Sequence, residues 1–250
     1  MPTPFFLYPI IFLYGIVIGS FLNVVILRVP VRESIVSKRS HCTSCSHVLH
    51  WYDLFPLFSY LFLRGRCRYC GAKISPQYPI VEAANGVLWM LMFVFCGMSW
   101  DTVLMCFVAS ALLCLSVIDA RTQEIPLGIN IFIAVCGVAR VCLHYGDWLN
   151  YLIGAVSVSW LLLIIFYASG GRAMGGGDVK LMAAAGLFLG WKLVILSFMF
   201  GCLYGSVIHI ARMKISKKDH VLAMGPYLSA GILTAMWFGE YVINWYISLF

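Results

Sequence analysis

Apolar segments of the length that a membrane-spanning helix needs follow one another along most of this chain. A helix crosses the hydrocarbon core with about 20 apolar residues, because each residue adds about 1.5 Å of rise. Hydrophobic residues are 62% of the 250 residues and charged residues 11%, which excludes a water-soluble globular fold. We therefore expect an all-α polytopic membrane protein with about eight transmembrane helices. The predicted spans are residues 5–27, 83–100, 102–118, 127–143, 149–168, 179–189, 192–210 and 221–247.

A polar stretch separates the first span from the others. It divides the chain into a first span at residues 1–27, an insert at residues 28–82 and a membrane core at residues 83–250. The insert has too few apolar positions to build a core of its own, so we expect a covalent crosslink or a bound metal ion to stabilise it. The span at residues 179–189 is short, and it either extends past Gly190 or packs inside the bundle.

Basic residues are distributed unevenly between the two sides of the predicted bundle. The insert and the later loops on its side hold 15 of the 17 Lys and Arg residues, whereas Arg140 and Lys192 fall on the opposite side. By the positive-inside rule, the insert is cytoplasmic and both termini lie outside. The net charge of +7 lies beside apolar spans, so it indicates contact with a lipid bilayer and no nucleic-acid partner.

The insert contains two Cys-x2-Cys pairs separated by 21 residues, formed by Cys42, Cys45, Cys67 and Cys70. Two such pairs at this separation are typical of a four-thiolate zinc site. Four thiolates leave no open position for a catalytic water, so the expected Zn²⁺ is structural. Redox or disulfide pairs are the alternative, although a cytoplasmic location disfavours disulfides. His41, His47 and His50 are nearby and are alternative ligands.

Two aspartates fall at the cytoplasmic ends of predicted spans, Asp119 after residues 102–118 and Asp178 before residues 179–189. Ionisable groups near the membrane interior are costly and usually functional. If packing brings the two carboxylates together, one holds a proton while the other is ionised, which suits acid–base hydrolysis of a peptide bond. The alternatives are that Asp178 is a helix N-cap and that Asp119 is an interfacial acid paired with Arg121.

Three glycines and a lysine flank Asp178. Gly175, Gly176 and Gly177 carry no side chains, which would let an extended substrate backbone pass close to the carboxylate. Lys180 either orients the substrate or extends its charge to the membrane surface.

Several motifs together resemble the type IV prepilin peptidases, which combine a leader peptidase with an N-methyltransferase. The resemblance covers nearly the whole chain. The matching motifs are GSFLNVVILRVP at residues 19–30, CTSC through YPIVE at residues 42–82, IDARTQEIP at residues 118–126, GGGDVKL at residues 175–181 and GPYL at residues 225–228.

The resemblance implies cleavage of a short basic leader from prepilins or pseudopilins at the cytoplasmic face of a bacterial inner membrane. Methylation of the new N-terminal residue with S-adenosylmethionine follows. Asp119 and Asp178 then become the aspartyl pair of a GxGD-type protease core at residues 83–250. The zinc-binding insert at residues 28–82 becomes associated with methyl transfer, and pilus or type II secretion machinery becomes a further partner.

Departures from the family pattern occur near the aspartates. Thr43 replaces a frequent proline, Leu127 a frequent Asn or Asp, and Ala173 a frequent acid. No site for S-adenosylmethionine is evident from spacing; Gly65 and Glu82 are the candidate residues.

Two other classes of function fit parts of the pattern. A proton-coupled transporter would use the same aspartate pair, but usually shows repeated halves that this sequence lacks. A membrane scaffold would use the zinc insert to bind a partner and would not need either aspartate.

Overall fold

The computed structural model describes residues 4–37, 39–172, 174–215 and 223–249. Within these ranges the regular elements are helices and there is no β-strand, which confirms the all-α prediction. The elements are α1 (Leu7–Arg28), η1 (Trp51–Asp53), α2 (Phe58–Phe62), α3 (Gln77–Cys96), α4 (Trp100–Thr122), α5 (Leu127–Leu143), η2 (Tyr145–Asp147), α6 (Trp148–Ala168), α7 (Gly176–Leu189), α8 (Trp191–Ile215) and α9 (Gly225–Ile247).

Five helical segments of the described ranges are long and apolar enough to cross a membrane. They are α1, α3, α4, Tyr145–Ala168 and Trp191–Met213. This supports a membrane protein but does not confirm eight spans, because α5 and α7 are shorter and α9 is not among the five. The predicted final span began at residue 221, which lies outside the described residues, and α9 begins at Gly225.

Helix contacts divide the chain into two compact units, Met1–Thr102 and Val103–Phe250. The boundary predicted at residue 83 differs from this division, because residue 83 lies inside α3 and α3 packs on α1 of the first unit. The insert belongs to the first unit, where it is shorter than residues 28–82 because α3 already begins at Gln77.

The α1 and α3 helices cross closely at glycines. A Cβ atom on Gly15 would lie 2.7 Å from the Cα atom of Gly86, and one on Gly19 would lie 2.8 Å from the Cα atom of Glu82. Asn85 Nδ2 donates a buried hydrogen bond of 2.7 Å to the carbonyl oxygen of Gly15. Small residues and buried amide bonds are the usual means by which helices associate in lipid.

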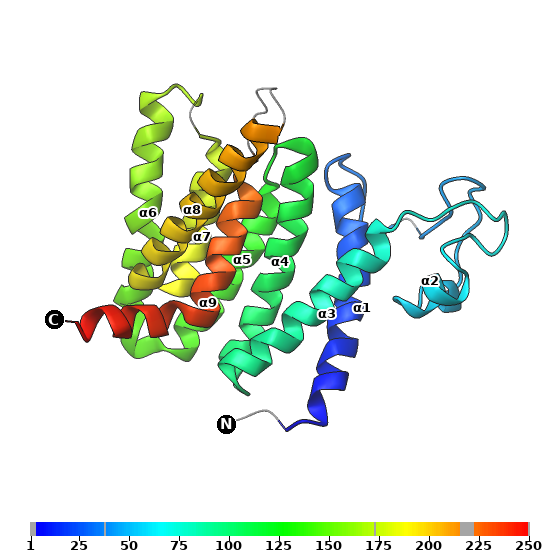
Figure 1. Ribbon diagram of the computed structural model, residues 1–250, viewed down its shortest axis with the longest axis horizontal. Helices are drawn as coiled ribbons and strands as arrows, with labels where there is room; N and C mark the ends of the chain where they lie inside the picture. The colour runs from blue at the N-terminus through cyan, green and yellow to red at the C-terminus, as the bar shows by residue number, and fades with distance from the viewer. Residues whose placement is uncertain (1–3, 38, 173, 216–222, 250) are drawn as a thin grey trace. The chain divides into compact units, whose positions relative to one another are not determined.

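Helix α7 lies inside the second unit, where it packs against α5, α6 and α8 (Figure 1, yellow). Its 14 residues rise about 21 Å, less than the roughly 30 Å of a hydrocarbon core. Nine of these residues are buried. Of the two alternatives for residues 179–189, the structure therefore shows packing inside the bundle, with the helix beginning earlier, at Gly176.

Neighbouring helices contact α7 along its length. Gly186 of α7 crosses Gly154 of α6 so closely that a Cβ atom on Gly186 would overlap the carbonyl oxygen of Gly154. From α5, Asn130 Nδ2 donates to the carbonyl oxygen of Gly177 at 3.4 Å, and Arg140 Nη1 donates to that of Phe188 at 2.9 Å. Helix α5 therefore holds both ends of α7.

The crossing of α6 and α7 is testable by adding one methyl group. Gly186→Ala should destabilise the protein by about 1–3 kcal/mol or more, because the obstacle is backbone and cannot change rotamer. Thermal unfolding of the detergent-solubilised protein measures the change. Gly128→Ala is the matched control, since a Cβ atom at that helical position meets nothing within 4 Å. Equal melting temperatures for Gly186→Ala and the wild type would contradict the close crossing.

Candidate functional site

The two predicted catalytic aspartates occupy the end of α4 and the first turn of α7. Asp119 is 4% exposed and Asp178 is 7% exposed. Ile125, six residues after Asp119, packs against Gly177, the residue before Asp178, so the end of α4 and the start of α7 meet. The structure therefore brings together two buried acids that are 59 positions apart in the sequence.

Asp119 has a specific hydrogen-bond donor. The backbone N–H of Gly225, the first residue of α9, donates to Asp119 Oδ2 at 2.8 Å in a buried position. A Cβ atom on Gly225 would lie 2.6 Å from the same oxygen. The Asp119 side chain is enclosed and does not extend to solvent, which gives no support to the alternative of an interfacial acid paired with Arg121.

Asp178 is not the N-cap of the helix, so that alternative is also wrong. The N-cap is Gly175, whose extended backbone precedes the helix, and Asp178 is the third helical residue. The backbone N–H of Asp178 donates to the carbonyl oxygen of Gly175 at 3.1 Å. As the third helical residue, Asp178 has its carboxylate beside the backbone of the N-cap Gly175, whose N–H acts on it, and near the positive end of the helix dipole.

The three glycines before Asp178 have different surroundings. A Cβ atom on Gly177 would lie 2.8 Å from the Cβ atom of Ile125, so this glycine allows the loop after α4 to contact α7. Gly176 has only ordinary contacts, to Phe166 at 3.7 Å. At Gly175, which is exposed, the nearest atom to a Cβ would be Asp178 Oδ2 at 3.3 Å. Gly175 is therefore the glycine that leaves room beside the carboxylate.

The other residues noted near Asp178 lie at the surface or outside the described ranges. Lys180 is exposed and stands about 200° around the helix from Asp178. Leu127 is the first residue of α5 and is 54% exposed. Ala173 lies outside the described residues. Substrate contact by Lys180 stays a prediction.

Two residues near the aspartates carried no assigned role in the sequence. Gly225 is the first residue of the GPYL motif and of α9. A glycine followed by a proline at a predicted helix start was the sequence feature that could have drawn attention to it. Asn130 is 3% exposed, and its Oδ1 atom is buried with no hydrogen-bond partner in the described part of the chain. A buried amide inside an apolar helix was the signal for Asn130.

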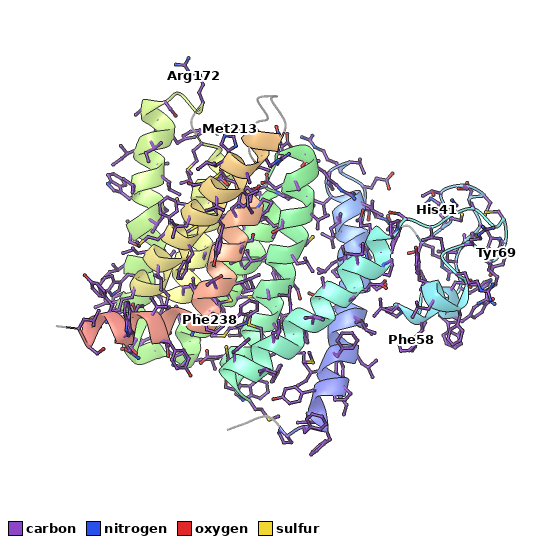
Figure 2. All side chains as sticks on the ribbon, viewed as in Figure 1. His41, Phe58, Tyr69, Arg172, Met213 and Phe238 are labelled. Carbon is purple, nitrogen blue, oxygen red and sulfur yellow. The ribbon has the colours of Figure 1, made fainter. Side chains whose placement is uncertain are left out.

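Basic side chains gather at the end of the second unit where α7 begins. Figure 2 shows Arg172 and Met213 at this end and Phe238 at the other. Arg121, Arg172 and Arg212 are exposed. Lys217 and Lys218, which were counted on the same side, lie outside the described residues.

The insert brings its four cysteines together. The sulfur atoms of Cys42, Cys45, Cys67 and Cys70 all lie within 4.8 Å of one another, and those of Cys42 and Cys70 are 3.9 Å apart. A tetrahedral zinc ion with bonds of about 2.3 Å requires sulfur atoms about 3.8 Å apart. The spacing and the ligand type therefore fit one zinc ion.

The two cysteine pairs form matching turns. In the first, the Cys42 N–H donates to the carbonyl oxygen of His47, and in the second the Cys67 N–H donates to that of Ala72. Each turn closes with a residue of positive φ, Ser46 at 58° and Gly71 at 70°. Such turns present two sulfur atoms to one point.

The thiols are electrostatically suited to a cation. Backbone N–H groups of Cys45 and Ser44 lower the pKa of Cys42 to about 6. At Cys70 the N–H of Ala72 favours the thiolate, but desolvation and the neighbouring thiols outweigh it and raise the pKa of Cys70 to about 11. Clustered thiols resist complete ionisation unless a metal ion balances their charge.

The histidines of the insert have other contacts. The described cluster of metal-ligating groups consists of the four cysteines alone. The His41 Nδ1 atom lies 3.3 Å from the carbonyl oxygen of Arg39, and the His47 ring centroid is 3.7 Å from that of Tyr69. These contacts give no support to histidine ligands.

A buried carboxylate, that of Asp53, links the second cysteine turn to η1. Arg68 Nε donates to Asp53 Oδ1 at 2.8 Å, and the Tyr69 hydroxyl donates to Asp53 Oδ2 at 3.0 Å. Desolvation favours the protonated form of Asp53, but these hydrogen bonds outweigh it and hold the pKa of Asp53 below its usual value. The residues around the second cysteine pair are thereby tied to η1.

The two candidate cofactor residues have packing contacts in the first unit. Gly65 has φ of 66°, and a Cβ atom there would lie 2.9 Å from the Tyr60 hydroxyl. Glu82 is 6% exposed, and its Oε2 atom accepts a hydrogen bond of 2.8 Å from the N–H of Leu57. Their predicted role with S-adenosylmethionine stays a prediction.

The chain matches two family models, the bacterial peptidase A24 N-terminal domain over residues 13–96 and the type IV leader peptidase family over residues 106–210. It is 31% identical to a prepilin leader peptidase/N-methyltransferase of Bacillus subtilis, over 96% of this chain and 98% of the relative. Proteins of the same name from Aeromonas salmonicida and Pseudomonas aeruginosa are 30% identical, over 98% and 94% of this chain and 95% and 92% of the relatives. No solved structure matches significantly.

Proposed function

Because the chain belongs to the type IV leader peptidase family, we propose that it cleaves the leader from prepilins or pseudopilins and then methylates the new N-terminus. The relatives' name combines both activities, and the similarity extends over both units. The observation that carries the peptidase proposal is the buried pair of Asp119 and Asp178. Membrane helices rarely bury two neighbouring acids without a functional reason.

The two carboxylates provide the acid and the base for hydrolysis. One of two neighbouring carboxylates keeps a proton while the other is ionised. The start of α7 favours negative charge on Asp178 through its helix dipole, but Asp119 accepts a buried 2.8 Å hydrogen bond from the Gly225 N–H, so we assign Asp119 as the base that takes a proton from the attacking water. Asp178 donates its proton to the carbonyl oxygen as the water oxygen bonds to the carbonyl carbon, which gives a tetrahedral gem-diol. The carbon–nitrogen bond then breaks as Asp119 passes its proton to the leaving amine and Asp178 takes one back from a gem-diol hydroxyl. Gly225 is a positioning residue, because it acts through Asp119.

The substrate backbone is proposed to pass beside Gly175. This exposed position leaves room next to Asp178, whereas Gly177 is in contact with Ile125. Gly176 and Lys180 were also predicted to contact substrate, and the exposure of Lys180 suits contact with a polar or acidic part of it. The prepilin or pseudopilin itself is the proposed partner, and pilus or secretion machinery is a further one.

Methyl transfer is proposed to involve the first unit. The methyl donor is S-adenosylmethionine, and the acceptor is the α-amine released by cleavage. The amine nitrogen bonds to the methyl carbon and loses a proton, while the methyl–sulfur bond breaks and S-adenosylhomocysteine leaves. Gly65 and Glu82 stay the proposed contacts for the donor. The buried carboxylate of Glu82 supports this, since it could attract a cationic group.

The insert is proposed to hold one structural zinc ion through Cys42, Cys45, Cys67 and Cys70. Sulfur spacing close to that of a tetrahedral zinc site supports this. The bound ion would stabilise the fold of the insert, which has little apolar core of its own. We further propose that the insert and the aspartates are on the cytoplasmic side of a bacterial inner membrane, because basic residues gather there.

The transporter and scaffold alternatives are not favoured. Neither explains a family match that includes both aspartates together with relatives that share nearly the full length of the chain. A scaffold would also leave the buried aspartates without a role.

Replacement of either aspartate should abolish leader cleavage. Asp119→Asn and Asp178→Asn should each lower the rate by about 10²-fold or more, the usual contribution of a positioned acid or base. Purified enzyme is incubated with a prepilin and S-adenosylmethionine, and intact mass reports the leader loss and the methyl gain separately. The exposed Asp147→Asn is the control. Substantial cleavage by either mutant of the pair would exclude the proposed mechanism.

Gly225→Ala should slow cleavage without loss of either carboxylate. The added methyl would lie 2.6 Å from Asp119 Oδ2 and displace it, and misplacement of about 1 Å costs roughly 10²-fold in rate. The same mass assay measures the rate. Gly205→Ala is the control, because a Cβ atom there has contacts of 3.7 Å or more. Wild-type rates for Gly225→Ala would remove Gly225 from the site.

Metal analysis tests the zinc proposal. Purified protein should contain about one zinc ion per chain, as expected for a closed four-thiolate site. Joint replacement Cys42→Ser and Cys67→Ser should remove it, whereas Cys142→Ser, an exposed cysteine of α5, should retain it. Metal-free wild-type protein with full peptidase and methyltransferase activity would refute a zinc site.

A further inference from the structure

Helix α2 in the insert presents an apolar face with no partner among the described residues. Phe58, Leu61 and Phe62 occupy positions i, i+3 and i+4, which lie on one side of a helix. They are 41%, 69% and 84% exposed. Phe55 continues this surface, because its ring centroid lies 5.5 Å from that of Phe58. We call these four side chains the α2 apolar face.

The opposite side of α2 faces the insert itself. Tyr60 packs over Gly65, where a Cβ atom would lie 2.9 Å from the tyrosine hydroxyl. Figure 2 shows Phe58 at one end of the insert and His41 and Tyr69 toward the other. The α2 apolar face lies on the side of the helix opposite Tyr60, and its exposure shows that it is not part of the insert's own core.

The start of α2 is hydrogen bonded to the membrane-spanning helix α3, at a point beyond the first turn of α3. Leu57, the N-cap of α2, donates its N–H to Glu82 at 2.8 Å. Glu82 is five residues into α3, which begins at Gln77, so this bond lies about 8 Å along the helix from its first residue. Leu57 has a φ of 59°, an unfavourable value for leucine that fixes the direction of its N–H. Helix α2 is thus held at the depth of the span.

Basic side chains follow the α2 apolar face directly. Arg64 and Arg66 are exposed and follow Phe62 within four residues of the sequence, whereas Arg68 is paired with Asp53. Arginines beside exposed aromatic residues suit the boundary of an anionic bilayer, where the rings enter the apolar zone and the guanidinium groups contact lipid phosphates.

We propose that the α2 apolar face docks into the boundary between headgroups and acyl chains of an anionic bilayer. The insert is then held at the membrane surface by a monotopic contact in addition to its two chain connections. Attachment at the depth of α3, unpartnered aromatic residues and flanking arginines all point to lipid. The proposal does not depend on the peptidase or methyltransferase activity of the chain.

Photo-crosslinking in a bilayer tests this directly. Full-length protein carrying Phe62→benzoylphenylalanine is reconstituted without substrate in nanodiscs that contain phosphatidylglycerol and phosphatidylcholine. Irradiation followed by mass spectrometry counts lipid adducts. The matched control is Val48→benzoylphenylalanine, because Val48 is an apolar residue of the first cysteine turn that is 44% exposed.

The Phe62 probe should give roughly tenfold more lipid adducts than the Val48 probe, since burial of one phenylalanine shifts such an equilibrium by at least about that factor. Leu61→benzoylphenylalanine should behave like the Phe62 probe. Phosphatidylglycerol should be enriched among the adducts, and Arg64→Gln with Arg66→Gln should reduce that enrichment. Equal yields at Phe62 and Val48 would overturn the proposal. If added prepilin replaces lipid as the crosslinking partner of the Phe62 probe, the proposal is also overturned, and the face is identified as a peptide-docking surface.

Discussion

The length of α7 constrains the second unit. A helix of 14 residues cannot cross a hydrocarbon core of roughly 30 Å, so its backbone ends must find partners inside the protein. Arg140 donates to the carbonyl oxygen of Phe188 at the C-terminal end, while the bond from Asn130 and the crossing with Gly154 hold the rest of the helix in place. Asp178 is in the first turn of this supported helix, where it is buried near Asp119 and away from bulk solvent.

The two candidate sites are built by different physical means. The cysteine cluster needs only contacts within 28 residues, and local turns with positive φ supply most of its geometry. The aspartate pair depends on helices that are distant in sequence and on one backbone N–H from α9. A metal ion can organise the first site directly, whereas the second requires complete packing of its unit.

Much of this organisation could be predicted from the sequence. Apolar length predicted helices, and cysteine spacing predicted a four-sulfur cluster, because both signals are local. The start of α7 was misplaced because glycines at residues 176 and 177 suggest a turn, whereas packing against Ile125 keeps Gly177 within the helix. The contact between Gly225 and Asp119 could not be predicted, since no periodicity relates residues so far apart. The attachment of α2 to Glu82 was also hidden, because it uses a backbone N–H that every non-proline residue carries.

The hydrogen bond between Asp119 and Gly225 forms late, because the two residues are synthesised at different times. It joins residues separated by 106 positions. At synthesis rates of about 5–20 residues per second, the ribosome reaches Gly225 roughly 5–20 s after Asp119. Until then α4 holds a carboxylate without its backbone donor. The nascent chain therefore passes through membrane insertion with an incomplete site, and acquires a finished one only when its final helix joins the bundle.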